Sequence, residues 1–340
     1  MRGENVPGCY RILAIDGGGI KGLYSAVILE EIEKVYGPVY QNFNLICGTS
    51  TGGIIALALA SGMPASDIVR FYKEKGPSIF PYQNPFYRKI HYFKQILIKS
   101  KYSSNQLKLA LEEVFQDKKI EDCKTSVLIP TVNVTTGSPY VFKSDHQPTL
   151  TRDSKRLLSE VALATTAAPT YFPIVELQTK EGPQQFVDGG LWANNPSLLG
   201  MQEYFTYYLN KGFDSYCLLS ISSLNEHARF PEPHKVWKSK SFSSWGNKLI
   251  STMIDTQSFA VDNHMKFITK YLPGHYVRIT STELSDQEKK YIELDRACPT
   301  AISIMLDKGV QASKKWLFED SVRKIFEYHI QEGEKYVKLS

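Results

Sequence analysis

The sequence predicts an α/β fold, in which a mainly parallel central sheet is flanked by helices and followed by a mostly helical C-terminal extension. Short apolar runs suited to buried strands alternate with longer runs whose apolar residues recur at helical spacing. The first two apolar runs each end in a glycine-rich turn that opens a helix. Because strands linked by helices pair in parallel, these observations favour a sheet covered by helices.

The first half of the chain contains two strand–helix units. Residues 11–15 predict a buried strand, and the helix after it ends at Gly37 and Pro38. Residues 43–47 predict the second strand, and residues 52–60 predict an apolar helix. Both strands therefore lead directly into glycine-rich turns.

The second half predicts a hairpin-like pair of strands at 126–134 and 140–143, joined by a turn rich in Thr, Gly and Ser. An alanine-rich helix at 159–168 stops at a proline, and a short strand at 185–187 follows. Other segments complete the prediction: helices near 107–115, 196–209 and 318–329, a strand at 216–221, and a loop at 225–247.

Size and composition set outer limits on the protein class. The 340 residues can bury a large core, and the net charge of +5 favours anionic surfaces without defining a partner. The N-terminal residues lack an apolar signal-peptide core, and no run reaches the roughly 18 apolar residues that span a bilayer. Five scattered cysteines give no disulfide framework, so we expect reduced thiols in a cytoplasmic protein.

The segment from Gly48 to Gly52 matches the pattern G-x-S-x-G, with Ser50 at its centre. A nucleophile on a sharp strand-to-helix turn needs small neighbours, because its backbone is strained and crowded. The following helix directs its positive end at Ser50, which favours developing negative charge there. A glycine- and serine-rich loop is the alternative interpretation, but the position between an apolar strand and an apolar helix favours a nucleophile.

The glycines at 17–22 also fit G-x-G-x-x-G, the pattern of dinucleotide-binding folds. That fingerprint needs an acidic residue about 20 positions later, and residues 34–66 contain neither Asp nor Glu. We therefore interpret the backbone N–H groups of Gly17, Gly18 and Gly19 as an oxyanion hole.

A serine nucleophile needs a base, and Asp188 is the best placed candidate. It follows a short strand and precedes Gly189 and Gly190, whose turn exposes it. An Asp-Gly-Gly segment alone is more often only a turn, but the two other motifs favour catalysis. None of the seven histidines lies in a recognisable triad context.

These three motifs, in this order, closely resemble the patatin-like phospholipases, and the match extends from about residue 12 to 201. Segments 164–173 and 192–196 resemble further parts of that family. The resemblance implies a three-layer sandwich that cleaves acyl esters of glycerolipids without a metal, with Ser50 as nucleophile and Asp188 as general base. The supporting motif glycines are Gly22, Gly48, Gly52, Gly189 and Gly190.

Segments 76–80, 101–103 and 139–142 resemble the bacterial subgroup that acts as phospholipase effectors in cyclic-oligonucleotide anti-phage defence (CBASS). That resemblance implies a cyclic dinucleotide as allosteric activator and membrane phospholipids as substrate at the inner face of the cell membrane. It implies no DNA or RNA partner, and it leaves homo-oligomerisation open. We expect a catalytic domain at 10–205, and a part at 206–340 that completes the fold and carries effector sensing.

Three further interpretations stay open. Residues 71–102 are rich in aromatic and basic side chains, which suits either an anionic membrane surface or a solvated helix with core aromatics. Segments 237–248 and 271–278 carry aromatic and basic residues that could bind a nucleotide, and no local motif indicates which of the two does. Family members often carry a glycine-rich turn where residues 222–225 read Ser-Ser-Leu-Asn. A constitutive lipid hydrolase or a weakly catalytic sensor are the alternative functions.

Overall fold

The computed structural model describes residues 8–81, 100–224 and 247–327. Its centre is an eight-stranded sheet with the order β5-β6-β3-β2-β1-β7-β8, and β4 pairs with β3 beside this path. Five neighbouring strands, β3-β2-β1-β7-β8, run parallel, whereas β4, β5 and β6 join by antiparallel pairs. The predicted α/β class with a mainly parallel sheet is confirmed. The strands are β1 (Gly8–Ile15), β2 (Leu45–Gly48), β3 (Ser126–Asn133), β4 (Ser138–Lys143), β5 (Val175–Thr179), β6 (Gly182–Asp188), β7 (Phe213–Ile221) and β8 (Gly274–Ile279).

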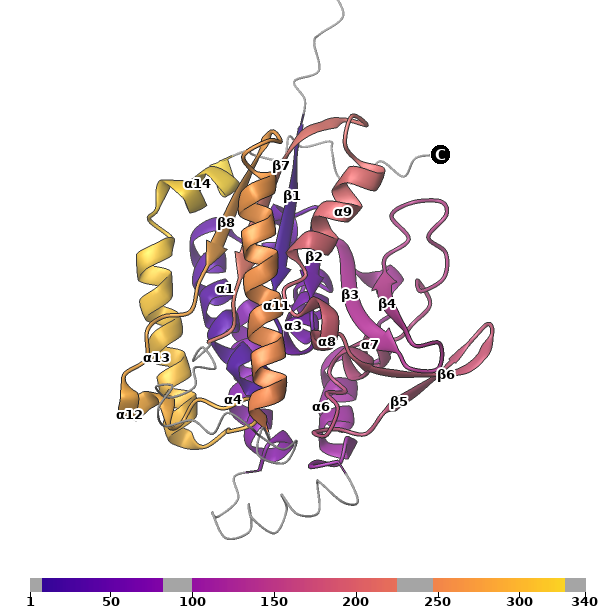
Figure 1. The fold of residues 1–340 in the computed structure, drawn as a ribbon, viewed down its shortest axis with the longest axis vertical. Helices are drawn as coiled ribbons and strands as arrows, with labels where there is room; N and C mark the ends of the chain where they lie inside the picture. Colours follow the sequence, from indigo (N-terminus) through magenta and orange to yellow (C-terminus); the bar gives the residue numbers. More distant parts are fainter. Residues whose placement is uncertain (1–7, 82–99, 225–246, 328–340) are drawn as a thin grey trace, which may run out of the picture.

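Helices cover both faces of this sheet, which gives three layers (Figure 1). Helices α1, α3 and α13 belong to the larger core on one face, and α9 and α11 cover the other. Two 3₁₀ turns lie at Gly19–Lys21 and Ile120–Asp122. The helices are α1 (Gly22–Tyr36), α2 (Val39–Asn42), α3 (Thr51–Ala60), α4 (Ala65–Ile79), α6 (Asn105–Phe115), α7 (Leu158–Thr165), α8 (Gly190–Ala193), α9 (Ser197–Tyr207), α11 (Asn247–Ile268), α12 (Asp286–Lys289), α13 (Pro299–Trp316) and α14 (Asp320–Glu327).

The alternation of side chains along β1 divides the interior into two cores. Ile12 and Ala14 pack with the residues of α9 and α11, whereas Leu13 and Ile15 pack with those of α1 and α3. Successive residues of a strand point to opposite faces of its sheet, so a strand that is apolar throughout is covered on both sides. β1 is therefore a central strand whose C-terminal end is surrounded by protein.

The C-terminal third contributes to the same sheet as the N-terminal part. β7 pairs in parallel with β1 on one side and with β8 on the other. The sequence predicted β7 but not α11, β8 or α13, and it missed β5, the antiparallel partner of β6. The sheet therefore extends across residue 205, because β7 and β8 continue it beyond β1.

Candidate active site

Ser50 occupies the sharp turn between β2 and α3. Its backbone has φ 54° and ψ −126°, a strained conformation for a residue with a side chain. A Cβ atom at Gly48 would overlap the carbonyl oxygen of Gly52, and one at Gly52 would overlap that of Ile15. Only glycine fits on either side, because backbone from β1 and α3 closes around the turn.

The strained turn is held by a threonine that the sequence analysis did not single out. Thr165, the last residue of α7, accepts a hydrogen bond from the Ser50 N–H at 3.0 Å. Its hydroxyl in turn donates to the Pro130 carbonyl at 2.7 Å. This two-bond chain ties the backbone of Ser50 to β3 and fixes the direction of its side chain.

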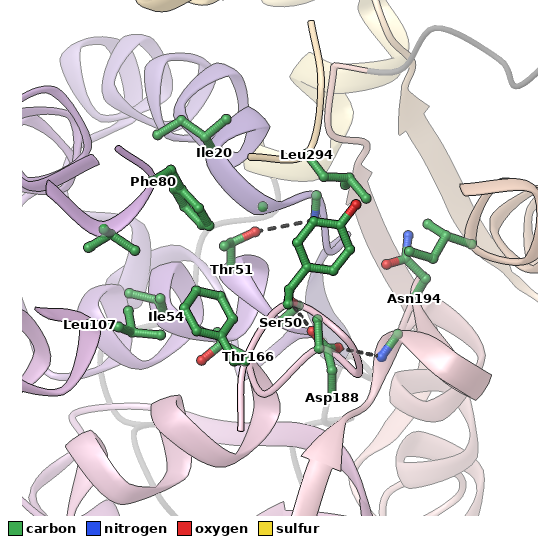
Figure 2. A pocket seen from close by; sticks show the side chains of 18 of the residues that line it. Ile20, Ser50, Thr51, Ile54, Phe80, Leu107, Thr166, Asp188, Asn194 and Leu294 are labelled. Atoms are coloured by element: carbon green, nitrogen blue, oxygen red, sulfur yellow. Dashed lines mark hydrogen bonds between the residues drawn. The ribbon is translucent and has the colours of Figure 1, made fainter. Parts of the chain in front are cut away.

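Asp188 ends β6 and lies beside Ser50 (Figure 2). The Ser50 hydroxyl donates to Asp188 Oδ2 at 2.6 Å, and the Gly190 N–H donates to Oδ1 at 2.6 Å. A Cβ atom at Gly189 would overlap the Pro130 carbonyl oxygen, so glycine lets this turn pack against β3. The two motif residues, 138 positions apart, therefore meet in one hydrogen bond.

Burial changes the acid–base behaviour of Asp188, whose side chain is only 5% exposed. Desolvation raises its pKa to about 6, and the hydrogen bonds from Ser50 and Gly190 offset only part of that effect. A carboxylate with a pKa near 6 is a better proton acceptor than an exposed one, yet it is still ionised at neutral pH.

The glycine loop, residues 17–19, lies beside Ser50 and Asp188, and its Gly18 and Gly19 line the same cavity. The Gly17 N–H donates to the Asn194 carbonyl at 3.1 Å, so it is already used within the protein. The Gly18 N–H donates to Thr51 Oγ1 at 3.2 Å, whereas that of Gly19 has no partner among the residues the structure describes. The three predicted donors are thus not equivalent, and Gly18 and Gly19 are the two that line the cavity.

An open cavity contains Ser50 and Asp188. Apart from these two residues, a few polar groups and the glycine loop, its walls are apolar (Figure 2). Helices α4 and α11 both supply lining residues, together with the segment that follows α7. An elongated apolar ligand such as an acyl chain would bury its surface favourably there. The larger apolar lining residues are Ile20, Ile54, Phe71, Ile79, Phe80, Leu107, Phe172, Leu191, Ile250, Met253, Ile254 and Leu294.

Comparison with known protein families identifies the chain. The family model described as patatin-like phospholipase matches residues 13–199, which is more than half of the chain. The chain belongs to the patatin-like phospholipases. The resemblance drawn from the three motifs is therefore confirmed, and with it membership in a family of lipid acyl hydrolases.

Two curated bacterial proteins resemble this patatin-like phospholipase over most of its length, and both are called cGAMP-activated phospholipase. The protein from Pseudomonas aeruginosa is 34% identical over 309 residues, which cover 91% of this chain and 89% of that protein. The protein from Vibrio cholerae is 32% identical over 333 residues and covers 91% of both. Among solved structures, human GIVD cytosolic phospholipase A2 aligns with a TM-score of 0.46 and 10% identity, covering 96% of this chain and 61% of that one.

In segment 271–278, which the sequence suggested as a nucleotide-binding segment, Arg278 has a structural role in this patatin-like phospholipase. Arg278, at the end of 271–278, is 8% exposed and pairs with Asp16 through two bonds of 3.1 and 2.5 Å. It also donates to Ser220 Oγ at 2.6 Å. Arg278 therefore supports the start of the glycine loop. Segment 237–248 lies almost wholly outside the described residues.

The aromatic residues of 71–102 that the structure describes face inward in this patatin-like phospholipase. Phe71, Tyr72, Phe80 and Tyr102 are all buried, and the first three line the cavity. Residues 82–99 lie outside the described part, so the membrane hypothesis for them stays a prediction. Ser223 packs against Gly18, because a Cβ atom added at Gly18 would overlap the Ser223 side chain. The 222–225 turn, which lacks the family's usual glycines, therefore contacts the glycine loop.

The described residues of this patatin-like phospholipase contain neither a metal-binding cluster nor a membrane-spanning helix. Within 8–81, 100–224 and 247–327, no group of three or more His, Cys, Asp or Glu side chains is arranged to hold a metal ion. No helix in those ranges has the length and hydropathy of a bilayer-crossing segment.

Proposed function

We propose that this protein is a phospholipase that cleaves fatty acyl esters of membrane glycerophospholipids through a Ser50–Asp188 dyad. The observation that carries the proposal is the 2.6 Å hydrogen bond from the Ser50 hydroxyl to Asp188 Oδ2, in a cavity with mainly apolar walls. The apolar walls suit an acyl chain, and the dyad lies where its ester carbon can be reached.

The geometry supports a two-step acyl transfer that needs no metal. Ser50 Oγ attacks the ester carbonyl carbon while Asp188 Oδ2 accepts its proton, and the resulting oxyanion is stabilised by the amide of Gly19. Asp188 then returns the proton to the departing lysophospholipid oxygen. A water molecule, deprotonated by Asp188, hydrolyses the acyl-Ser50 ester and regenerates both side chains.

Activation by a cyclic dinucleotide is the second part of the proposal. It is supported by curated relatives that share 32 and 34% identity over 91% of this chain and are named cGAMP-activated phospholipases. We place the protein in the cytoplasm, where it acts on the inner face of the cell membrane in anti-phage defence. The C-terminal part, residues 206–340, is the proposed carrier of effector sensing, and residues 10–205 are the proposed catalytic domain.

One experiment tests both parts. The purified full-length protein is incubated with phospholipid vesicles, with and without cGAMP, and free fatty acid is measured. We expect release that depends on cGAMP, and a loss of at least about 10³-fold in the Ser50→Ala and Asp188→Asn variants.

The outcomes separate the alternatives. Equal release without the nucleotide would favour a constitutive hydrolase and remove the regulatory part of the proposal. Unchanged release by Ser50→Ala, with folding checked by circular dichroism, would remove Ser50 from the mechanism. Nucleotide binding with no release under any condition would favour a weakly catalytic sensor.

A further inference from the structure

The carbonyl group of Leu294 presses directly against the glycine loop. It accepts the Ile20 N–H at 2.9 Å, and a Cβ atom at Gly19 would overlap its oxygen. Gly19 has a φ of 59°, a conformation that suits glycine and directs the neighbouring peptide groups. The position of this one carbonyl therefore constrains the orientation of the Gly19 and Ile20 amides.

The next residue, Asp295, anchors that carbonyl to the opposite side of the cavity. Its carboxylate is 5% exposed in the ion pair with Lys101, whose side chain is 13% exposed. It also accepts a hydrogen bond from the Tyr102 hydroxyl at 2.8 Å. Asp295 therefore binds two consecutive residues of a distant segment.

That segment is itself part of the cavity wall. The N–H groups of Lys101 and Tyr102 donate to the carbonyls of Thr170 and Tyr171, both at 2.8 Å. Tyr171 lines the cavity, and the Tyr102 ring packs against that of Phe172, another lining residue, at 5.8 Å between centroids. Asp295 thus joins the wall after α7 to the segment that supports the glycine loop.

General stabilisation is a weak explanation for this arrangement. Desolvation of two charges offsets most of the attraction between them, so a buried ion pair adds little stability relative to an apolar pair of similar size. The Asp295–Lys101 pair does provide a fixed geometry, because the two charges separate if either of the segments that carry them moves.

We propose that Asp295 is a positioning residue for the glycine loop: it fixes the Leu294 carbonyl, which sets the Gly19 amide toward the oxyanion. The catalytic consequence rests on the proposed Ser50–Asp188 mechanism. The structural consequence, a fixed Ile20 N–H, does not depend on it.

The test compares Asp295→Asn with Glu203→Gln in the full-length protein. Glu203 is a matched control, since it is 2% exposed and binds two side chains, Lys143 at 2.5 Å and His146 at 2.7 Å, none of which lines the cavity. Both variants neutralise a buried carboxylate that binds a lysine and a second side chain, but only Asp295 contacts the cavity wall. Tyr102→Phe removes one hydrogen bond to Asp295 and serves as a milder variant if Asp295→Asn does not fold.

Two measurements give the answer. In hydrolysis of a soluble acyl ester, we expect Asp295→Asn to lower kcat by about tenfold or more, with little change in KM, because one misplaced oxyanion donor costs up to about 10²–10³ in rate. In hydrogen exchange, we expect faster exchange of the Ile20 amide in Asp295→Asn, and in Tyr102→Phe to a smaller extent, than in the wild type or Glu203→Gln.

An unchanged Ile20 exchange rate in the folded Asp295 or Tyr102 variants would overturn the proposal whatever the activity. An equal loss of kcat in Glu203→Gln would also overturn it, because the effect would then follow from the loss of any buried pair. If the wild type hydrolyses no ester at all, the proposed function fails, and the exchange data still decide the positioning role.

Discussion

The chemistry of Asp188 is set by two opposing effects on one carboxylate. Burial disfavours its charged form, and the hydrogen bonds from Ser50 and Gly190 favour it. The result, a pKa near 6, makes Asp188 more basic than an exposed carboxylate by about two powers of ten. The proposed mechanism therefore needs no histidine between Asp188 and Ser50, since the two side chains are already hydrogen-bonded.

This pKa predicts the pH dependence of hydrolysis. In the proposed mechanism Asp188 must be ionised to accept the Ser50 proton, so kcat/KM should be constant above pH 7 and fall about tenfold per pH unit well below pH 6. The measurement is hydrolysis of a soluble ester from pH 4.5 to 8, with folding followed by circular dichroism at each pH. A flat profile in the folded protein down to pH 5 would contradict this assignment.

The sequence could predict residues whose constraints are local. Gly48 is required by the Gly52 carbonyl four positions away, so a short pattern reveals it, and the same pattern includes Gly52 although the carbonyl that requires Gly52 is that of the distant Ile15. Asp16 and Arg278 are 262 positions apart, and nothing near either residue indicates the other. Thr165 was equally hidden, because a threonine at a helix end is common and only the fold brings it to Ser50.

Among the elements, α13 holds the helix that follows the glycine loop. It packs along α1, and the contact is close at Gly309, where an added Cβ would lie 2.7 Å from Val27 Cβ and 3.2 Å from the Tyr24 carbonyl oxygen. Such a small residue lets two helix backbones approach each other. Helix α13 thereby fixes α1, whose N-terminal end follows directly from the glycine loop.

We predict that Gly309→Ala weakens this contact. The methyl group would force the helices apart, and overpacking costs about 1–3 kcal/mol, whereas the higher helix propensity of Ala returns about 1. We therefore expect the free energy of unfolding to fall by about 1 kcal/mol in urea titrations. Ser303→Ala, at an exposed position of the same helix, should cause no loss. Equal stability of the two variants would show that α1 and α13 have room to separate.

The sequence did not predict β8 and α11, because polar or exposed residues interrupt the apolar pattern of each. β8 has only two fully buried apolar side chains, Val277 and Ile279, and the residue between them is Arg278. An arginine in a strand normally indicates a solvent-facing side, but here Asp16 neutralises it inside the protein. α11 combines the lining of the cavity with exposed large residues such as Met253 and Phe267, which obscures its buried face.

On the scale of the whole molecule, the sheet depends on both ends of the chain. The family model matches residues 13–199, yet β1, which leads into the glycine loop, pairs along its length with β7 at 213–221. β8 continues the sheet and supplies Arg278 to Asp16. The part that matches the family model therefore contains the motif residues but only one of the two strands that pair with β1.

This architecture predicts the behaviour of a shortened chain. A protein that ends at residue 209 loses β7, β8, α11 and α13, so β1 becomes an edge strand and both of its apolar faces lose helices or strands that cover them. Asp16 also loses Arg278, which leaves a buried carboxylate without its partner, a change that typically costs about 3–5 kcal/mol. We expect no cooperative thermal unfolding and no ester hydrolysis from this fragment, in contrast to the full chain. Co-expression with residues 210–340 should restore both, since the missing strands can then pair with β1. A cooperative transition in the fragment alone would show that the first 209 residues form an independent domain, and that the later strands only extend it.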